Sequence, residues 1–368
     1  MRILYMIDEM QALTDGGTER QVLQMIALMK QAGADVHLCT LRGTEWLTAE
    51  QAGCPVEHFH YRSFWRPGSI MELLRLRRWM RDKKVEILQT FFVEANILGP
   101  LVGRMASVPI ILGSRRNLNY WMSPLAALAQ RIANRFAMRL VANCNAVKQH
   151  VIATESVDAG KVDVMYNGLD AAHFAPNDER RRQLRQEYGF RDSDVVVGAV
   201  SVLRPIKGCE TFIDAAGEVL RQDPNARFVL VGDGPLRSSL ETRAASLGDR
   251  FRFAGAQKDI RPFLNMFDIG VLASESEGFS NSILEYLAAG LPCVVTNVGG
   301  NPEAIENAGV VVTQKQPAEL AEAVLILLRD RVRRASLSTK ALARAKDFDL
   351  ESTQSKLAAY YERLLGLH

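Results

Sequence analysis

The sequence predicts an α/β protein made of two doubly wound parallel-sheet domains in tandem. The chain has 368 residues, about the length of two ordinary domains. Short apolar runs alternate with helical patterns from one end to the other, which is the order of repeated β–α units. One polar, arginine-rich segment, residues 167–193, interrupts this alternation and indicates the linker between the two domains.

The first series of strands and helices predicts an N-terminal domain of residues 1–172. Its helical patterns are Glu19–Gln31, Ser69–Lys83, Ala95–Ala106, Pro124–Met138 and Ala146–Thr154. Its apolar runs, which favour strands, are Ile3–Ile7, Val36–Thr40, Ile87–Thr90, Ile110–Gly113, Leu140–Asn143 and Val162–Met165.

The second series predicts a C-terminal domain of residues 173–349. A last helix over residues 350–366 has apolar residues at helical spacing, and we expect it to pack back onto the first domain. Two doubly wound units in tandem predict a ligand cleft between the carboxyl ends of their strands. The strands of the second series are Val195–Ser201, Phe228–Gly232, Arg252–Ala254, Ile269–Leu272, Cys293–Thr296 and Gly309–Val312.

Composition excludes several classes of protein. The net charge of +3 is too small to indicate a nucleic-acid binder. The apolar run at the N-terminus is too short for a signal peptide, and no stretch is apolar enough to span a bilayer. His58 and His60 lack a third metal ligand nearby, so we expect no metal site. Buried reduced thiols of a cytoplasmic protein are expected at Cys39, Cys54, Cys144, Cys209 and Cys293.

The most informative motif runs from Glu277 to Glu285, directly after an apolar strand. A helix that begins near Ser280 offers free backbone N–H groups and a positive dipole end, which suit a diphosphate. Glu277 precedes this helix, and Glu285, about two turns in, could accept hydrogen bonds from a diol such as a ribose. Alternatively, the two residues are one loop acid and one acid on the helix surface.

A second motif is the pair Arg204 and Lys207, on the loop that follows the first strand of the second domain and ends at Gly208. Two cations three residues apart can bind both phosphates of a diphosphate, Arg as a planar fork and Lys as a point charge. Two solvated loop charges are the alternative for this motif taken alone.

Two glycine-containing turns are weaker signals. Gly232-Asp233-Gly234-Pro235 ends a strand but is not a dinucleotide-binding G-x-G-x-x-G motif. Asp15-Gly16-Gly17-Thr18-Glu19-Arg20 lies between the first strand and the first helix, where glycines let backbone amides approach an anion.

Together with Asn167-Gly168-Leu169-Asp170 and Gly299-Gly300-Asn301-Pro302-Glu303, these motifs resemble family 4 of the retaining glycosyltransferases. The resemblance covers essentially the whole chain. It implies the GT-B architecture, with two Rossmann-like domains, an interdomain cleft and a C-terminal crossover helix. Its most specific parts are the Arg204/Lys207 pair and the Glu277/Glu285 block, followed by Ala288-Ala289-Gly290-Leu291-Pro292.

The resemblance also implies roles for the donor-binding residues. Arg204 and Lys207 would bind the diphosphate and stabilise the leaving group, and Glu277 would contact the donor sugar near the reaction centre. Glu285 would hold the ribose. The remaining implied donor contacts are Gly16, Gly17, Gly232, Gly255, Ala256, Phe279, Ser280, Asn281, Ser282 and Ile283.

By the same resemblance, the reaction would transfer a sugar from a nucleotide-diphosphate sugar to a saccharide acceptor in bacterial polysaccharide or lipopolysaccharide-type synthesis. UDP is the nucleotide we expect, because it is the commonest in the family. No cofactor or metal is expected, since the cations and the helix dipole neutralise the leaving diphosphate.

On the acceptor side the sequence departs from the family pattern, because relatives often carry a His in two loops where this chain has none. The polar groups available there are Glu94 and Asn96 in the first loop, and Arg115 and Arg116 in the second. We expect Glu94 or Arg115 to contact the acceptor or the donor sugar, and we count Glu94 with Arg204, Lys207 and Glu277 as catalytic. Asn96, Arg115 and Arg116 are expected to lie at the acceptor. A plain helix N-terminal acid is the alternative for Glu94.

Basic residues in the first domain suggest contact with an anionic membrane surface, at the cytoplasmic face. Because family 4 members often glycosylate lipid-linked acceptors from that face, the resemblance implies a lipid-linked acceptor here. A solvated basic face is the alternative to membrane contact. Tyr120-Trp121-Met122 precede the second of the two basic segments. The basic residues are Arg75, Arg77, Arg78, Arg81 and Lys84 along one helix, and Arg131, Arg135 and Arg139 along one face of another.

Three other functions are considered. A nucleotide-sugar epimerase would use the same donor site without an acceptor. A non-catalytic nucleotide-sugar-binding subunit of a glycan-assembly complex would not need Arg204, Lys207, Glu277 and Glu285 together. A nucleic-acid binder is disfavoured by the charge.

Overall fold

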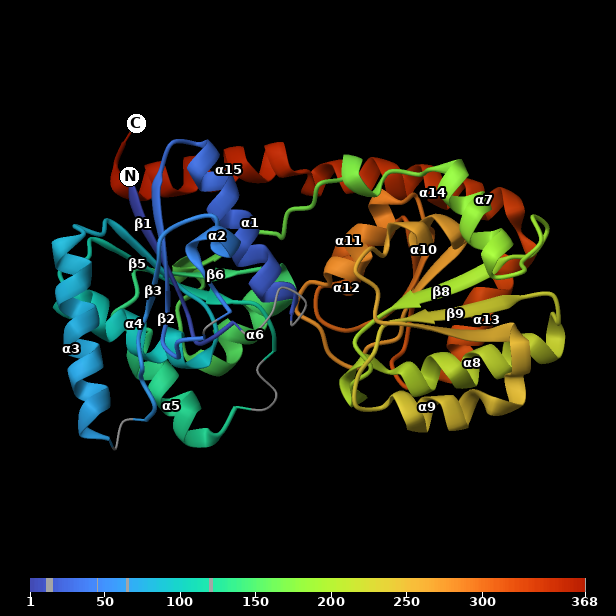
Figure 1. The fold of residues 1–368 in the computed structure, drawn as a ribbon, viewed down its shortest axis with the longest axis horizontal. Coiled ribbons are helices and arrows are strands. Elements are labelled where there is room, and N and C mark those ends of the chain that lie inside the picture. The colour runs from blue at the N-terminus through green and yellow to red at the C-terminus, as the bar shows by residue number, and fades with distance from the viewer. Residues whose placement is uncertain (11–15, 45, 64–65, 119–121, 368) are drawn as a thin grey trace. The chain divides into compact units, whose positions relative to one another are not determined.

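This computed structural model describes residues 1–10, 16–44, 46–63, 66–118 and 122–367. The chain forms two compact units (Figure 1). Unit 1 consists of Met1–Gly168 and Leu350–His368, and unit 2 of Leu169–Asp349. Each unit is an α/β layer structure with its own parallel sheet, as the alternation of apolar runs predicts.

Unit 1 contains, within the described residues, a seven-stranded sheet in the order β3-β2-β1-β4-β5-β6-β7, with every neighbouring pair parallel. The short strand β3 was not predicted, because its sequence Val-Glu-His has no apolar run. The strands are β1 (Arg2–Ile7), β2 (Asp35–Thr40), β3 (Val56–His58), β4 (Ile87–Thr90), β5 (Ile110–Arg115), β6 (Arg139–Ala142) and β7 (Val162–Val164).

Helices cover both faces of this sheet (Figure 1). Alternate residues of β1, among them Ile3 and Tyr5, form one core with α1 and with the C-terminal helix α15, which contributes Leu357 and Tyr361. Helices α3, α4 and α5 cover the other face. The helices are α1 (Gly17–Gln31), α2 (Ala49–Ala52), α3 (Pro67–Asp82), α4 (Val93–Met105), α5 (Pro124–Ala133), α6 (Asn145–Glu155) and α15 (Leu350–Leu365).

Helix α5 is shorter than the sequence predicts, and this corrects one expectation. It begins at a strong start signal, because Pro124 occupies the first turn and the Ser123 hydroxyl accepts the N–H of Ala126. It ends at Ala133 rather than Met138. Arg135 therefore lies in the turn after the helix, and Arg139 begins β6, so neither shares a helical face with Arg131. The Arg139 guanidinium contacts the carbonyl of Gly160.

Unit 2 contains, in the described part of the chain, a six-stranded parallel sheet in the order β10-β9-β8-β11-β12-β13. The strands are β8 (Val196–Val200), β9 (Arg227–Val231), β10 (Phe251–Gly255), β11 (Ile269–Leu272), β12 (Cys293–Thr296) and β13 (Gly309–Val312). The helices are α7 (Asp178–Glu187), α8 (Cys209–Gln222), α9 (Arg237–Ala244), α10 (Arg261–Met266), α11 (Asn281–Ala288), α12 (Asn301–Ile305), α13 (Pro317–Arg329) and α14 (Arg331–Ala345).

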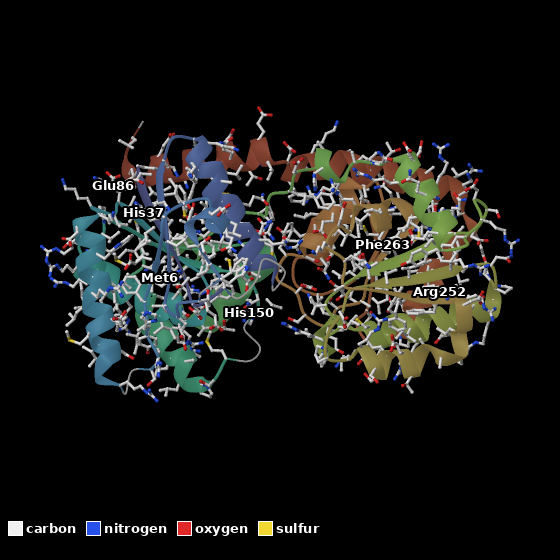
Figure 2. All side chains as sticks on the ribbon, viewed as in Figure 1. Met6, His37, Glu86, His150, Arg252 and Phe263 are labelled. Carbon is white, nitrogen blue, oxygen red and sulfur yellow. The ribbon has the colours of Figure 1, made fainter. Side chains whose placement is uncertain are left out.

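Apolar side chains fill the space between the sheet and the helices in each unit. Figure 2 labels Met6 inside unit 1 and Phe263 inside unit 2, and both are buried, whereas Arg252 is exposed on β10. The main core of unit 2 joins α8, α9 and α13 to the sheet, with α8 and α13 packed against each other. The five cysteines are all buried, as expected, and none forms a disulfide bond among the described residues.

Candidate functional site

Each sheet has one point where the strand order reverses, and open α/β sheets bind ligands there, beyond the carboxyl ends of the strands. In unit 1 the reversal lies between β1 and β4, and in unit 2 between β8 and β11. Arg204 and Lys207 follow β8, Glu277 lies on the loop after β11, and Glu94 lies in the first turn of the helix after β4. The strand order thus places the strongest sequence motifs at the reversal points.

In unit 2, Lys207 and Glu277 meet across the reversal point. Lys207 ends a short 3-10 helix (Pro205–Lys207), and its Nζ lies 2.7 Å from Glu277 Oε1. The same Oε1 accepts a hydrogen bond of 2.7 Å from the Ser274 hydroxyl, which is fully buried. Arg204 is exposed, and its side chain makes no hydrogen bond or ion pair to any described residue. Arg204, Lys207 and Glu277, three of the four predicted catalytic residues, therefore lie on adjacent loops, and Glu277 is held from two sides.

Glycines allow these loops to pack closely. A Cβ on Gly232, whose φ is +132°, would lie 1.8 Å from the carbonyl oxygen of Ser201. A Cβ on Gly208, with φ of +61°, would lie 2.0 Å from the carbonyl oxygen of Ala273. The Gly232 N–H also donates to the carbonyl of Gly255 at the end of β10. Gly232 and Gly255 therefore build the loop scaffold, and Ala256 follows as an exposed residue.

Tyr286 holds β8 and β11 apart behind this site. The two strands pair only at Val197/Ile269 and Gly198/Gly270. Beyond these residues the Tyr286 hydroxyl fills the gap, accepting from the Val200 N–H at 2.8 Å and donating to the Val271 carbonyl at 3.2 Å. Its ring packs where Gly270 has no side chain, since a Cβ there would approach it to 2.8 Å. The splayed strands leave room at their carboxyl ends for the loops of the site.

Helix α11 begins at Asn281, and the side chain of its N-cap residue, Ser280, makes no capping hydrogen bond. Ser282 lies in that turn and hydrogen-bonds to the Val200 carbonyl through its hydroxyl, while Ile283 is buried. Glu285 is only 2% exposed, so it is a buried carboxylate and not an acid on the helix surface. Phe279 is also buried, and its ring contacts that of Phe348.

In unit 1, a pocket of about 440 Å³ lies at the corresponding reversal point. Glu94, Asn96, Arg115 and Arg116 all line it, so the structure brings the four predicted acceptor-side residues together. Its wall also includes Asp8, Thr18, Arg42, Phe92, Val93, Ser114, Asn117, Met122, Ser123, Ala126 and Gln130.

Asp8 connects β1 to the start of α4 in this pocket. Its carboxylate accepts the backbone N–H groups of Glu94, at 3.1 Å, and Ala95, at 2.6 Å. It thereby caps α4 in place of the preceding residue, Phe92, which has a φ of +70° and makes no side-chain cap. Burial raises the pKa of Asp8 to about 7, against the lowering effect of both hydrogen bonds.

Glu94 lies in the first turn of α4 and is tied to Arg42. Its Oε1 forms an ion pair with Arg42 Nη2. Its Oε2 is buried and has no hydrogen-bond partner among the described residues. Both interpretations of Glu94 are therefore compatible with its position, because it is a helix N-terminal acid that also faces the pocket.

Arg115 and Arg116 have different environments. Arg115 is 2% exposed, and Glu155 and Asn134 bind its guanidinium, with Glu155 Oε1 at 2.8 Å from Nε. Arg116 has no carboxylate within ion-pair distance among the described residues, and its Nη2 donates to Asn167. Burial lowers the pKa of Arg116 to about 10. Arg115 is thus neutralised within unit 1, and Arg116 is the less compensated cation.

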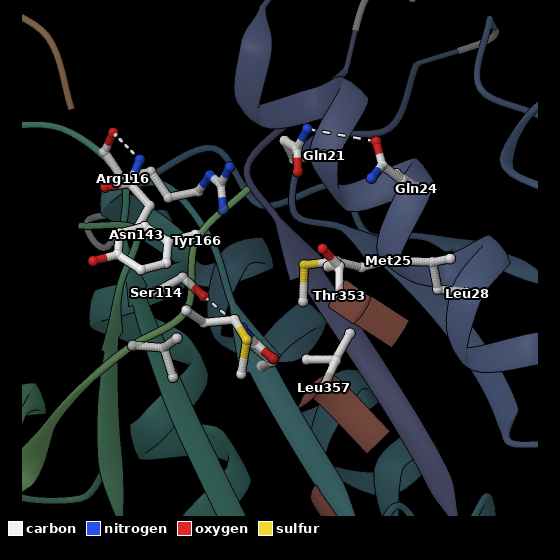
Figure 3. A pocket seen from close by; sticks show the side chains of 13 residues that line it. Gln21, Gln24, Met25, Leu28, Ser114, Arg116, Asn143, Tyr166, Thr353 and Leu357 are labelled. Atoms are coloured by element: carbon white, nitrogen blue, oxygen red, sulfur yellow. Dashed lines mark hydrogen bonds between the residues drawn. The ribbon is translucent and has the colours of Figure 1, made fainter. Parts of the chain in front are cut away.

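Asn96 and a smaller cavity complete this region. Asn96 is buried, donates to the Ser114 carbonyl and accepts from the Thr90 hydroxyl, so its amide is already satisfied. Behind Arg116 lies a cavity of about 20 Å³, which is too small for a sugar ring (Figure 3). The larger pocket is therefore the candidate saccharide site of unit 1.

The glycine turn before α1 is described only in part, because Asp15 lies outside the described residues. Gly16 is the N-cap of α1 and Gly17 its first residue. A Cβ on Gly16 would lie 2.2 Å from Glu19 Oε2, so the Glu19 carboxylate folds back over the start of α1. Tyr120 and Trp121 also lie outside the described residues, whereas Met122 lines the larger pocket.

Comparison with known proteins decides the family. The sequence pattern described as "Glycosyl transferases group 1" matches residues 194–330, and that described as "Glycosyl transferase 4-like domain" matches residues 16–168. The chain belongs to the family 4 glycosyltransferases. Its two Rossmann-like sheets are those of the GT-B fold, and the predicted resemblance, fold class and enzyme class are confirmed.

Relatives and solved structures support this assignment. UDP-Gal:alpha-D-GlcNAc-diphosphoundecaprenol alpha-1,3-galactosyltransferase of Escherichia coli is 28% identical over 309 residues, 79% of each chain. Alpha-D-kanosaminyltransferase of Streptomyces kanamyceticus is 29% identical over 82% of this chain and 83% of its own. The structure of Anabaena Alr3699/HepE in complex with UDP-glucose is 25% identical, with a TM-score of 0.83 over 99% of this chain and 100% of its own.

Several site residues of this glycosyltransferase were not singled out from the sequence. Asp8, Arg42, Ser274 and Tyr286 have no motif of their own. Asp8 and Ser274 share one available signal, since each is the first or second residue after a buried strand at a reversal point. Arg42 and Tyr286 are recognisable only from the tertiary contacts.

Two further searches concern metals and membranes. No group of three or more His, Cys, Asp or Glu side chains that could hold a metal ion occurs among the described residues. Of the helices in the described part of the chain, none is long and apolar enough to cross a membrane.

Proposed function

We propose that this glycosyltransferase is a retaining, metal-independent enzyme that transfers a sugar from a UDP-sugar to a saccharide acceptor in bacterial glycan synthesis. The observation that carries the proposal is the set of Arg204, Lys207 and Glu277 around the start of α11, at the reversal point of unit 2. The complex of Anabaena Alr3699/HepE with UDP-glucose supports UDP as the nucleotide.

In the proposed reaction, the bond between the anomeric carbon and the donor phosphate breaks while the acceptor oxygen bonds to the same carbon on the same face. Arg204, Lys207 and the first turn of α11 offset the charge that develops on the leaving diphosphate. The proton of the acceptor hydroxyl passes to an oxygen of the leaving phosphate, so no separate general base is required. Glu277, held by Ser274, positions a donor-sugar hydroxyl.

The buried carboxylate of Glu285 is assigned to the ribose of the donor. It lies eight residues after Glu277, in the second turn of α11. A carboxylate accepts hydrogen bonds from both hydroxyls of a diol, and a buried one gains more from such partners than an exposed one.

The acceptor is assigned to the pocket of unit 1 near Glu94. The unpartnered Glu94 Oε2 is suited to accept a sugar hydroxyl, and Arg116 can donate to a hydroxyl or a phosphate oxygen. The E. coli relative is named for an acceptor with a diphosphoundecaprenol group, which supports a lipid-linked acceptor here.

Helix α5 supports a peripheral position on an anionic membrane, at the cytoplasmic face. Its inner face, with Ala126 and Gln130, lines the acceptor pocket. Its outer face presents Leu125, Leu128 and Ile132 at 74, 54 and 46% exposure, beside the exposed Arg131 and Arg135. Apolar side chains flanked by arginines are the composition of helices that lie in the membrane interface.

The donor assignment is tested by titrating UDP and GDP against thermal unfolding, without added metal. A ligand at about 100 times its dissociation constant should add about 2.7 kcal/mol of stability. We expect a shift with UDP that Glu285→Ala abolishes. No shift with either nucleotide would contradict the donor assignment, and a UDP shift followed by conversion of the UDP-sugar without acceptor would favour an epimerase.

The membrane assignment is tested by flotation with vesicles that contain anionic lipid. The double variant Leu125→Ser/Leu128→Ser should lose binding. The matched control is Val332→Ser/Leu342→Ser, which removes exposed apolar side chains from α14 of unit 2 instead. Equal binding by both double variants would refute the role of α5.

A further inference from the structure

Lys207 is engaged by a carboxylate in the ligand-free site. Its Nζ lies 2.7 Å from Glu277 Oε1, and the two side chains are 28 and 10% exposed. Because the Ser274 hydroxyl binds the same oxygen, Glu277 is fixed in this position from its other side. Ser274 is itself anchored, since its carbonyl accepts the Thr296 hydroxyl at 2.6 Å. These contacts hold the Glu277 carboxylate next to the loop that carries Lys207.

The charge balance of the site follows from this contact. The Lys207–Glu277 pair has no net charge, so Arg204 is the cation of this loop that no described carboxylate compensates. A diphosphate that binds here either replaces Glu277 as the ion-pair partner of Lys207 or lies close to the negative charge of Glu277. Either event weakens the binding of the diphosphate, because like charges repel at close range and an ion pair must be rearranged.

We propose that Glu277 lowers the affinity of this site for the free nucleoside diphosphate and thereby promotes product release. The inference rests on the proposed function, in which Lys207 binds the diphosphate and Glu277 a sugar hydroxyl. While the sugar is present, its hydroxyl offers Glu277 a hydrogen-bond donor that compensates the carboxylate. Once the sugar has been transferred, the partners of Glu277 among the described residues are Lys207 and Ser274, and Glu277 competes with the remaining diphosphate for Lys207.

The chain offers a matched control for this charge. Glu275 lies on the same loop, two residues away, but its carboxylate pairs with Lys315 at 2.8 Å. Glu275→Gln and Glu277→Gln therefore remove the same charge from the same loop, and only Glu277→Gln frees Lys207. Both substitutions keep the size of the side chain.

The experiment is calorimetric titration of UDP and of inorganic pyrophosphate into the full chain, with UDP dissociation rates from stopped flow. We expect Glu277→Gln to bind both probes about five- to tenfold more tightly and to release UDP more slowly, as expected for a partly buried charge contact. Glu275→Gln should stay within about twofold of the unchanged chain. Lys207→Met should bind at least about tenfold more weakly, because it leaves Glu277 facing the diphosphate.

Three outcomes separate this inference from the proposed function. If Glu277→Gln leaves UDP binding unchanged or weakens it, the inference is overturned but the proposed function is not. The same gain in Glu275→Gln would also overturn it, since the effect would then be one of general charge. Absence of binding by every variant overturns both. If Glu277→Gln did not fold, Glu277→Ala would remove the same charge, and UDP binding that it leaves unchanged or weakens would overturn the inference. UDP binding that Lys207→Met does not weaken would contradict the proposed role of Lys207 instead.

Discussion

Tyr286→Phe removes a single hydroxyl group from the middle of unit 2. In the structure this hydroxyl is fully buried and bonds to the Val200 N–H and the Val271 carbonyl, where β8 and β11 no longer pair with each other. No other group replaces it between the two strands, because the pairing ends at Gly198 and Gly270. The substitution therefore leaves two buried backbone groups without a partner.

The expected loss follows from these contacts. A buried donor or acceptor without a partner costs about 1–3 kcal/mol, so the two together should lower the free energy of unfolding of unit 2 by about 2–6 kcal/mol. That is a large fraction of the roughly 5–15 kcal/mol that stabilises an ordinary domain. The ring itself stays, so loss of packing contributes little.

The assay must report on unit 2 alone. All four tryptophans, at positions 46, 65, 79 and 121, belong to unit 1, so tryptophan fluorescence does not follow unit 2. Hydrogen exchange of peptides that contain β8 and β11 gives the required free energy. Tyr188→Phe is the control, because the Tyr188 hydroxyl bonds to no described residue while its ring packs on Phe190 and Phe263. A loss below about 1 kcal/mol, or one equal to that of Tyr188→Phe, would refute the reasoning.

Three further predictions concern single side chains. Burial raises the pKa of Asp8 from 3.8 to about 7, so the folded protein keeps this proton up to a higher pH than the unfolded chain does. The free energy of unfolding of unit 1 should therefore fall by up to about 4 kcal/mol as the pH rises from about 4 to 7. Asp8→Asn should abolish this pH dependence, measured by urea unfolding followed by tryptophan fluorescence. Glu155→Leu should lower the free energy of unfolding by about 3–5 kcal/mol, because it leaves the buried Arg115 without its carboxylate partner. Asp82→Leu breaks an exposed ion pair with Arg78 and should lower it by less than about 1 kcal/mol in the same unfolding experiment. Gly232→Ala should weaken UDP binding and lower the unfolding midpoint far more than Gly53→Ala. A Cβ on Gly232 would clash with the Ser201 carbonyl, whereas a Cβ on Gly53, which also has a positive φ, would have no atom within 4 Å. Equal effects of the two substitutions would contradict this prediction.

The strands were predictable because a doubly wound sheet buries both faces. The predicted runs Ile87–Thr90 and Cys293–Thr296, for example, are fully buried strands in the structure. The strand β3 escaped prediction because it lies at the sheet edge, where half-exposed residues suffice. The end of α5 was mistaken because Asn134 and Arg135 continue a helical pattern, while the chain must already turn into β6.

The donor-side residues were predictable for a topological reason. Loops that follow parallel strands gather at one edge of the sheet, so motifs after β8, β9, β10 and β11 had to come together. The direct contact of Lys207 with Glu277 was not predictable, because it depends on side-chain geometry across two loops 70 residues apart. The same holds for Ser274 and Tyr286, whose roles are defined only by the atoms they contact.

Two carboxylates, Asp8 and Glu94, lie at the reversal point of unit 1. Their hydrogen bonds indicate which of the two is available to a substrate. In unit 1, Asp8 uses both of its oxygens on the backbone N–H groups of Glu94 and Ala95. Glu94 uses one oxygen on Arg42 and keeps a buried oxygen that no described group satisfies. A buried carboxylate oxygen gains most from a donor that enters with a ligand. Glu94→Gln should therefore impair acceptor use more than donor hydrolysis, whereas Asp8→Asn should act mainly on the stability of unit 1.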